Sequence, residues 1–390
     1  MIPFEEALAI SSKYNPVSKI EHIDLVSSLG RYLAEDIKSD INMPPFNKTA
    51  VDGYACRKAD LDMELLINEV IPAGVPATRI VEEGRCAKIM TGAAMPPGAD
   101  WVFMVEDSVE KDGRVRFTGK AGKDNIAKLG EDIRKGDTVL RKGIMIRPQD
   151  IAVLATVGKA SVPVAARPVV GVISTGNELV EPGEKPASSQ IRNSNAYQLT
   201  AQVIRAGADA SYFGIAADDE TGTFTLLSKA LEECDIVLLT GGVSMGDFDL
   251  VPGAFEKAGV KVLFDRVAVQ PGKPTTFGVH EDALVFGLPG NPVSSFVQFE
   301  MFVRPMIQRA MGATDIEGFR KMQLAESYER KRGRRLALVP VSLGEDMTVQ
   351  AVEYHGSAHI NALPGANGLM KVPVGLTKLK KGELVDVRQI

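Results

Sequence analysis

The chain has 390 residues, of which 45% are hydrophobic and 24% charged, and its formal net charge is −5. This length allows two to four domains with a large core, and the negative charge disfavours general binding to nucleic acid or anionic membranes. The three cysteines contain no CxxC pair, which argues against a disulfide framework, and a histidine-built metal site is not expected in a chain with only four histidines.

The sequence contains no signal that would direct it to a membrane. Its first residues are acidic and lack an apolar signal region, and no apolar run approaches ~18 residues. We therefore expect no signal peptide, no membrane partner, a reducing compartment and a cytoplasmic location.

The first third of the chain predicts two domains. Residues 1–42 and 146–166 read as a helical linker domain, with one helix after Pro3 and another from Pro148 to Gly158. Residues 43–145 alternate short strands with Gly, Pro, Asn and Asp clusters, which predicts a mostly β domain ending in a hairpin over 135–143.

The rest of the chain predicts two further domains. Residues 167–315 alternate strands with helices, the last helix running from Pro292 to Met311, and this order is typical of a doubly wound α/β sheet. Residues 316–390 contain only short alternating strands and predict a β barrel or sandwich. The expected fold class is therefore multidomain, α/β and β.

Polar residues follow each predicted strand of the α/β domain, at the edge where such sheets bind ligands. The clusters are Ser174 to Glu178, Asp218 with Asp219, Thr240 to Ser244 continuing to Asp247 and Asp249, Gln270 to Lys273, and Pro289 to Pro292. Because the carboxyl ends of parallel strands share one edge, these clusters predict a single site.

The residue types indicate chemistry on an oxyanion. Glycine-rich backbone with Thr240, Ser244 and Lys273 suits phosphate, and carboxylates beside phosphate groups normally hold Mg²⁺. The chain has no GxxxxGK[ST] phosphate loop, no GxGxxG after a strand and no Ser–His or Cys–His arrangement, so a standard NTPase, a standard dinucleotide enzyme and a covalent nucleophile are not expected.

Several of these residues also have a structural interpretation. Asp219 can cap the helix that follows it, and Glu178 can be a surface acid in a turn. Lys273 lies between Gly272 and Pro274, which favours a functional role. The basic run over 330–335 is typical of a solvated hairpin tip, with anion binding as the alternative.

Six ordered motifs make the chain similar to a known family. They are PPFNKTAVDGYA, MTGAAMPPGAD, STGNEL, TGGVSMGDFD, QPGKPTTFG and GLPGNPVSS. Together they resemble the MoeA family of molybdopterin molybdenumtransferases, which is similar to the E domain of gephyrin, and the resemblance covers essentially the whole chain. It implies a MogA-like α/β domain, a mostly β insertion domain, a helical linker region and a C-terminal β barrel.

The resemblance implies an activity and a site. The substrates would be adenylylated molybdopterin and molybdate, AMP would be released, and Mg²⁺ would assist. Asp249, Lys273, Asp52 and Glu178 would be catalytic, and the metal would be held by Asp249, Asp218 and Glu178. The substrate would be bound by Thr91, Asp132, Thr175, Asn193, Asp218, Gly241, Gly242, Ser244, Pro289, Asn291 and Ser357.

The resemblance also implies partners. Family members are homodimers in which Asp52 and Thr91 of the partner subunit reach the cleft, and the adenylyltransferase and apo-molybdoenzymes are further expected partners. One position departs from the pattern, because some members have lysine where this chain has Gln270. A compensating arginine from the C-terminal domain is one expectation for that missing charge.

Three alternatives stay open at the level of the sequence. A MogA-like adenylyltransferase would share the α/β domain but would not need residues 43–145 or 316–390. A scaffold protein would not need the acidic site. A tungstate-selective paralogue is the third alternative, which the sequence does not exclude, because tungstate and molybdate have nearly the same size and charge.

Overall fold

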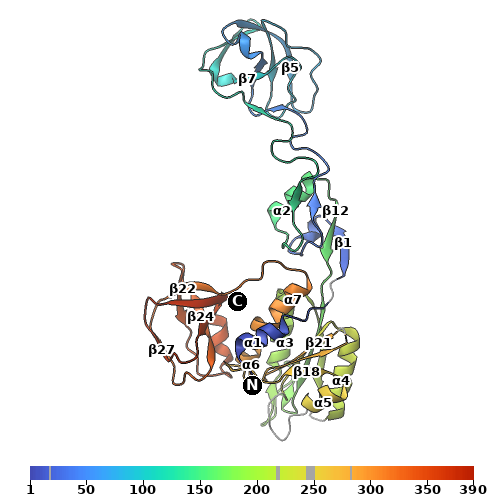
Figure 1. Cartoon of the computed structure of the whole chain (residues 1–390), viewed down its shortest axis with the longest axis vertical. Helices are drawn as coiled ribbons and strands as arrows, with labels where there is room; N and C mark the ends of the chain where they lie inside the picture. The colour runs from blue at the N-terminus through green and yellow to red at the C-terminus, as the bar shows by residue number, and fades with distance from the viewer. Residues whose placement is uncertain (17–18, 217–219, 243–250, 282) are drawn as a thin grey trace. The chain divides into compact units, whose positions relative to one another are not determined.

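The computed structural model describes residues 1–16, 19–216, 220–242, 251–281 and 283–390. The chain forms two compact units (Figure 1). Unit 1 contains residues 1–35, 142–147 and 161–390, and unit 2 contains residues 36–141 and 148–160.

The centre of unit 1 is a six-stranded sheet with the order β16-β13-β17-β21-β20-β18. Its strands are β13 (Val169–Thr175), β16 (Asp209–Ala216), β17 (Ile236–Thr240), β18 (Lys261–Phe264), β20 (Thr276–His280) and β21 (Ala283–Leu288). β16, β13, β17 and β21 pair in parallel, whereas β20 is antiparallel to both of its neighbours. The four parallel strands, joined through helices, are those that the sequence predicts.

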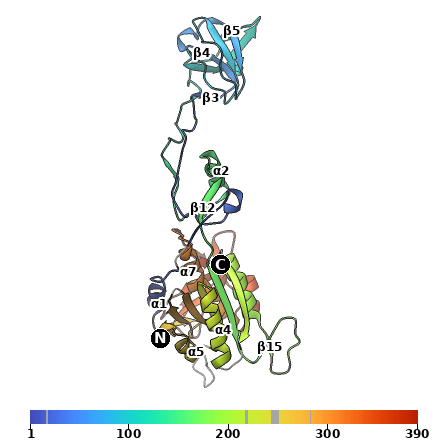
Figure 2. The same cartoon turned by 90° about the vertical axis from the view of Figure 1, so that its right-hand side faces the viewer.

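Helices cover both faces of this sheet (Figure 2). They are α3 (Ser194–Arg205), α4 (Glu220–Glu233), α5 (Val251–Lys257), α6 (Pro292–Gln298) and α7 (Arg304–Ala310). One core packs Val172 and Leu238 of the sheet against α3, α6 and α7, and a second packs Val237 and Leu239 against α4 and α5. Alternate residues of the buried strands therefore serve opposite layers.

Two details of this domain differ from the sequence prediction. The sequence did not predict strand β20. This strand contains Gly278, where an added Cβ would lie 2.6 Å from Val260, so the absence of a side chain leaves room for Val260. The predicted long helix is divided by a π-helical turn, η4 (Phe299–Val303), before α7. Pro305 lies just after this turn, and proline cannot donate the regular helical hydrogen bond.

The C-terminal part of unit 1 is a closed barrel, as the prediction allowed. Its strands pair in the ring β24-β25-β22-β28-β26 and back to β24, and β19 pairs in parallel with the first two residues of β24. The bounds are β19 (Val269–Gln270), β22 (Arg320–Leu324), β24 (Leu336–Leu343), β25 (Thr348–Ala351), β26 (Gly368–Val372) and β28 (Leu384–Gln389). Smaller elements are β23 (Tyr328–Glu329), β27 (Lys378–Leu379) and the 3-10 helix η5 (Ile360–Gly365).

The remaining elements of unit 1 come from the N-terminal and linker segments. Helix α1 (Phe4–Ser11) packs Phe4 edge-on against Phe302 at 5.6 Å. Strands β1 (Ile20–Asp24) and β12 (Ser161–Ala165) form an antiparallel ribbon that the sequence did not predict. The other short elements are the 3-10 helix η1 (Val26–Ser28), β14 (Leu179–Val180) and β15 (Ile191–Arg192).

Unit 2 is built on a six-stranded sheet with the order β7-β4-β6-β5-β9-β8. Its strands are β4 (Gly53–Cys56), β5 (Glu64–Ile71), β6 (Arg85–Ile89), β7 (Trp101–Met104), β8 (Ser108–Lys111) and β9 (Arg114–Phe117). Also present are β2 (Ile37–Lys38), β3 (Lys48–Thr49), β10 (Ile126–Ala127), β11 (Thr138–Leu140), α2 (Pro148–Thr156) and the 3-10 helices η2 (Lys58–Asp60) and η3 (Val105–Asp107). β11 pairs with β2, so the hairpin predicted over 135–143 is wrong; its partner is about 100 residues distant and invisible to local patterns.

Among the residues that the structure describes, we find no helix long and apolar enough to cross a membrane.

Candidate functional site

The candidate site begins where three parallel strands end together. Ser174 pairs with Thr240 and Thr240 pairs with Leu288, so β13, β17 and β21 finish side by side. β20 runs the other way and starts opposite Gly287, which brings the preceding Lys273 segment to the same edge. The sequence prediction that these loops share one edge therefore holds for the described residues of unit 1.

Two glycines after β17 form a close-packed turn against β13. Gly241 has φ +98° and Gly242 has φ +59°, in the region that side-chain-bearing residues rarely adopt. A Cβ on Gly241 would collide with the carbonyl oxygen of Thr175 and would stand 2.9 Å from its Oγ1. The Thr175 Oγ1 is buried and has no hydrogen-bond partner within the described part of the chain. This turn, which we call the glycine cradle (Thr175, Gly241 and Gly242), thus packs its backbone closely against β13 and encloses one buried hydroxyl.

Asn195 ties the cradle to the loop after β21, and the sequence reading had not selected it. Its Nδ2 donates to Thr240 Oγ1 at 2.9 Å and to the Gly290 carbonyl at 2.7 Å. Asn195 is the second residue of α3. The sequence signal that could have identified it is the Asn193-Ser-Asn195 motif at the start of that helix, directly after β15. Its amide joins three elements that the sequence keeps far apart.

We expect Asn195→Ala to loosen this junction. Thr240 and the Gly290 carbonyl would lose a shared donor in a half-buried place, which should lower the free energy of unfolding by about 1–3 kcal/mol. Urea unfolding followed by circular dichroism measures it. Ile204→Ala, at a side chain of the same helix that is 62% exposed, should cost less; equal losses would contradict the bridging role of Asn195.

Asn193 caps α3 and is a structural hub. Its Oδ1 accepts from the Ala196 N–H at 3.2 Å and from Ser174 Oγ at 3.0 Å, and its Nδ2 donates to the Tyr212 hydroxyl at 2.8 Å. Tyr212 in turn donates to Glu181 at 2.7 Å, and burial followed by this carboxylate raises the pKa of Tyr212. Asn193 is 1% exposed, so its predicted substrate contact stays a prediction while its capping role is plain.

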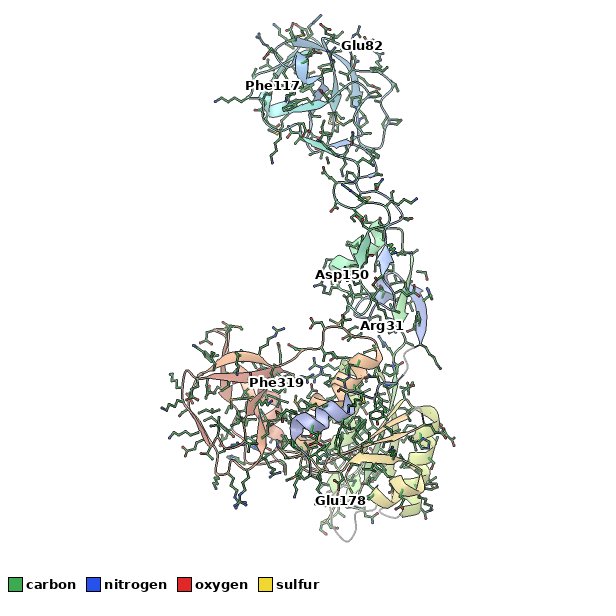
Figure 3. The ribbon with its side chains drawn as sticks, in the orientation of Figure 1. Arg31, Glu82, Phe117, Asp150, Glu178 and Phe319 are labelled. Carbon is green, nitrogen blue, oxygen red and sulfur yellow. The ribbon has the colours of Figure 1, made fainter. Side chains whose placement is uncertain are left out.

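Glu178 and Lys273 are the described charged residues of the predicted catalytic set in unit 1. The exposed Glu178 carboxylate lies beside Gly176, where an added Cβ would be 2.8 Å from its Cδ (Figure 3). Lys273 is also exposed. Neither side chain has an ion pair or hydrogen bond to another described residue, so both are available to a ligand.

The segment carrying Lys273 is anchored at two points. The Lys273 carbonyl accepts from the N–H groups of Val267 and Thr275, each at 3.0 Å. The buried Gln298 donates to the Pro271 carbonyl at 2.9 Å, and a Cβ on Gly272 would collide with its amide. The backbone is therefore fixed while the ammonium stays free.

The barrel contributes to the same edge. Asn291 Nδ2 donates to Ser357 Oγ at 3.0 Å, and the Val293 N–H donates to the Ser357 carbonyl at 3.1 Å. The Pro289 carbonyl accepts from Thr240 Oγ1 at 3.4 Å. The structure thus brings the predicted residues Pro289, Asn291 and Ser357 together.

The basic run of the barrel has a partly structural role. Arg330 donates to the carbonyls of Leu376, Arg335 and Pro373 at 2.7–2.9 Å, so it is not a solvated residue. Arg335 Nη1 donates to the Val269 carbonyl at 2.9 Å, one residue before Gln270. An arginine of the C-terminal domain therefore lies beside the position where a lysine is missing, although its compensating role stays a prediction.

Three predicted residues lie outside the described residues: Asp218, Ser244 and Asp249. The same applies to Asp219 and Asp247. Of the three carboxylates expected to hold the metal, only Glu178 is described. Within the described ranges no group of three or more His, Cys, Asp or Glu residues is placed to hold a metal ion.

Unit 2 carries the other predicted residues. Asp52 Oδ1 accepts from the Thr91 N–H at 2.6 Å and from the Thr91 hydroxyl at 2.7 Å. These two bonds, the backbone one first, lower the pKa of Asp52 below its ordinary 3.8. Asp132 is exposed, and its N–H donates to the Met43 carbonyl at 3.0 Å. Asp52 and Thr91 form a pair within unit 2.

We expect Thr91→Val to raise the pKa of Asp52 without restoring it fully, because the backbone bond persists. A depressed pKa means that the pair stabilises the folded state above pH 3.8 and that this contribution is lost as pH falls through the folded value. A carboxyl-carbon NMR titration measures the shift. Thr78→Val removes the comparable bond to Glu69 and should leave Asp52 unchanged; an Asp52 that does not respond to Thr91→Val would refute the assigned cause.

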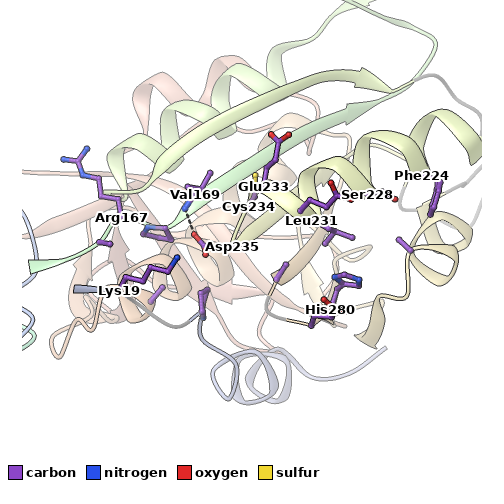
Figure 4. Close-up of a pocket in the computed structure, with 18 of the residues that line it drawn as sticks. Lys19, Arg167, Val169, Phe224, Ser228, Leu231, Glu233, Cys234, Asp235 and His280 are labelled. Atoms are coloured by element: carbon purple, nitrogen blue, oxygen red, sulfur yellow. Dashed lines mark hydrogen bonds between the residues drawn. The ribbon is translucent and has the colours of Figure 1, made fainter. Parts of the chain in front are cut away.

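A cavity of about 780 Å³ lies at the opposite edge of the same sheet (Figure 4). Val169, Asp235 and Ala283, at or beside the amino ends of β13, β17 and β21, line it together with Lys19 and His280. None of the predicted site residues contributes to this cavity. Its size alone does not make it the site, since doubly wound sheets bind ligands at the other edge.

Three family models match the chain in order. The MoeA N-terminal region (domains I and II) matches residues 2–158, the probable molybdopterin binding domain matches residues 171–309, and the MoeA C-terminal region (domain IV) matches residues 321–390.

Two relatives and a solved structure agree with these matches. The chain is 35% identical to the molybdopterin molybdenumtransferase of Staphylococcus epidermidis, covering 99% of this chain and 95% of the relative. It is 41% identical to the enzyme of that name from Bacillus subtilis (strain 168), covering 79% and 74%. The crystal structure of the molybdopterin biosynthesis MoeA protein from Pyrococcus horikoshii OT3 matches with a TM-score of 0.87 and 33% identity over all of both chains. The predicted multidomain α/β and β fold is confirmed, and the chain belongs to the MoeA family.

Proposed function

We propose that this chain is a molybdopterin molybdenumtransferase, which inserts molybdate into adenylylated molybdopterin and releases AMP in the last step of molybdenum cofactor synthesis. The observation that carries the proposal is the 35% identity, over 99% of the chain, to a relative of that name. All the domains matched in that family are present here, which disfavours the smaller adenylyltransferase.

The geometry of the sheet edge supports this chemistry. Molybdate and the phosphates of the substrate are oxyanions, and the edge offers the exposed Lys273 ammonium and the Gly241–Gly242 turn. The substrate brings its own dithiolene sulfurs to the molybdenum. The protein therefore needs to position two anions more than it needs a nucleophile of its own.

Mg²⁺ is part of the proposal. Glu178 is an exposed carboxylate free of protein partners in the described ranges, and such an oxygen ligand fits the preference of Mg²⁺ for one or two carboxylates plus phosphate oxygens. Asp218 and Asp249 would complete the ligand set. When bound, the ion would neutralise charge on the phosphoanhydride.

The proposed assembly is a homodimer acting in the cytoplasm, in which Asp52 and Thr91 of the partner subunit reach the cleft. Their mutual bonding in unit 2 keeps the Asp52 carboxylate ionised and fixed in direction. Light scattering on the full chain tests the assembly, and a monomer at working concentrations would contradict the shared cleft.

The decisive experiment supplies adenylylated molybdopterin, molybdate and Mg²⁺ to the full-length protein and follows AMP release. We expect wild type to release AMP and form cofactor, Asp249→Ala to lose about 100-fold or more in rate, and Asp62→Ala, an exposed change in unit 2, to behave as wild type. No activity in wild type would favour the scaffold interpretation. Equal activity in Asp249→Ala would refute the site assignment, and a parallel series with tungstate measures the preference between oxyanions.

A further inference from the structure

Two histidines of the C-terminal domain close a turn of the backbone. His355 and His359 lie between β25 and η5, and the His355 N–H donates to His359 Nδ1 at 3.3 Å. The His359 N–H donates in turn to the Gly356 carbonyl at 2.9 Å, and Gly356 has φ +127°, which a residue with a side chain rarely adopts. The imidazole of His359 therefore joins the two ends of this segment, which we call the histidine turn (355–359).

The middle of the histidine turn carries a residue of the candidate site. Ser357 Oγ accepts from Asn291 Nδ2 at 3.0 Å, and the Ser357 carbonyl accepts from the Val293 N–H at 3.1 Å. Asn291 directly precedes α6, and Val293 is the second residue of that helix. The turn is thus held by the start of α6 on one side and by the His359 ring on the other, so the position of Ser357 at the sheet edge depends on both.

The bond between the two histidines depends on the protonation of His359. Nδ1 can accept a hydrogen bond only when it carries no proton, so the neutral His359 ring has its hydrogen on Nε2. The two rings are stacked, with centroids 5.0 Å apart and planes at 14°, and Nε2 of His355 lies 3.0 Å from the Glu353 carboxylate. Protonation of His359 therefore removes the acceptor and places a positive charge against the His355 ring, and two protonated rings at this separation repel each other.

Few other titratable groups lie near His359 in the described structure. The helix η5, which begins at Ile360, packs against α6 and β24, and neither of these elements contains a charged or titratable residue. Within the loop, Tyr354 stays neutral near neutral pH, because burial raises its pKa to about 12. Histidine is the side chain whose charge ordinarily changes between about pH 5 and pH 8. The closure of the turn should therefore follow the protonation of the two histidines, with Glu353 as the carboxylate beside them.

We propose that His359 is a positioning residue, whose neutral imidazole holds the histidine turn closed and so keeps Ser357 on Asn291 at the edge that binds the anions. This inference rests on the proposed function and adds a pH-dependent element to it. Because the bond exists only with neutral His359, its contribution is present above the pH at which His359 protonates and is lost as the pH falls through that value. Acidification should therefore weaken the reaction, although it adds positive charge to a loop beside an anion site.

Three variants of the full-length protein test the proposal. His359→Asn supplies an oxygen near the place of Nδ1 that accepts at every pH, and asparagine is favoured before a helix, so this variant should fold. His359→Leu removes the acceptor, and His22→Asn is the control at an exposed histidine of β1. Between about pH 8 and pH 5.5, kcat/KM for AMP release should fall about 2- to 10-fold more in wild type than in His359→Asn, the effect expected of one hydrogen bond. His359→Leu should show this loss already at the higher pH, and His22→Asn should follow wild type.

Nitrogen NMR on the labelled protein tests the turn without any substrate. The neutral His359 ring should carry its proton on Nε2, and the Asn291 side-chain signals should shift as His359 protonates in wild type but not in His359→Asn. A neutral ring with its proton on Nδ1, or Asn291 signals that ignore His359, would refute the closure of the turn.

The kinetic results separate the remaining possibilities. Parallel pH profiles of wild type and His359→Asn would overturn the positioning role. A wild-type kcat/KM that rises on acidification relative to His359→Asn would overturn it as well, because the imidazolium would then bind the anion directly. No AMP release by wild type at any pH would refute the proposed function instead, and the NMR titration would still decide whether His359 controls the Ser357 turn.

Discussion

Replacing Gly241 with alanine is expected to reduce kcat/KM for AMP release by about 100-fold or more, because a displacement of roughly 1 Å in a reacting group can cost that much. Gly241 holds φ +98°, and a Cβ there would collide with the Thr175 carbonyl. The strained backbone should also cost about 1–3 kcal/mol of unfolding free energy. Steady-state kinetics and urea unfolding measure the two effects.

Gly183→Ala is the matched control, since Gly183 is exposed and an added Cβ would meet no atom within 4 Å. It should leave both rate and stability near wild type. If Gly241→Ala were tolerated as well as Gly183→Ala, the glycine cradle would not be part of the site.

Lys273→Met is expected to lower kcat/KM by about 10- to 100-fold, corresponding to the roughly 1.5–3 kcal/mol that a charged hydrogen bond contributes. The loss should arise because the ammonium is exposed at the sheet edge and unpaired within the described ranges, while its backbone is anchored by Val267 and Thr275. The stability should therefore change little. Kinetics with varied molybdate and varied adenylylated molybdopterin would show which anion the charge serves.

Two further variants serve as controls for the Lys273→Met result. Lys273→Arg keeps the charge and should retain more activity than Lys273→Met, while Lys381→Met removes a comparable exposed charge from the barrel and should have no effect. A Lys273→Met protein with wild-type kinetics for both anions would remove Lys273 from the catalytic set.

Much of the site could be predicted because parallel strands impose a common edge. The sequence marks each strand end with glycine and polar residues, as at Thr175, Gly241 and Pro289, and the register places those strands side by side. The Lys273 segment reaches the same edge for a reason that the sequence reading missed, namely that the unrecognised strand β20 runs antiparallel and starts there.

Other features depended on contacts between distant parts of the chain. Asn195 links Thr240 and Gly290 across 45 and 95 residues, and no local pattern distinguishes that asparagine from an ordinary helix-start residue. In the sequence, Arg388 is not distinguishable from an exposed arginine near the C-terminus, whereas in the structure it is buried. The pairing of β11 with β2 likewise joins segments that are distant in the sequence and could not be predicted from local patterns.

The sequence by itself determined the doubly wound sheet, the family and the common edge of the strand-end loops, because hydrophobic periodicity and glycine-rich turns are local signals. Only the tertiary structure decided how the site is held: Asn195 across the strand ends, Gln298 beneath the Lys273 segment, and Ser357 of the barrel on Asn291. It also decided that Arg388 is buried with two donor atoms that have no hydrogen-bond partner in the described structure. The physical reason is that burial and hydrogen-bond satisfaction depend on which distant residues meet, and folding alone sets those distances.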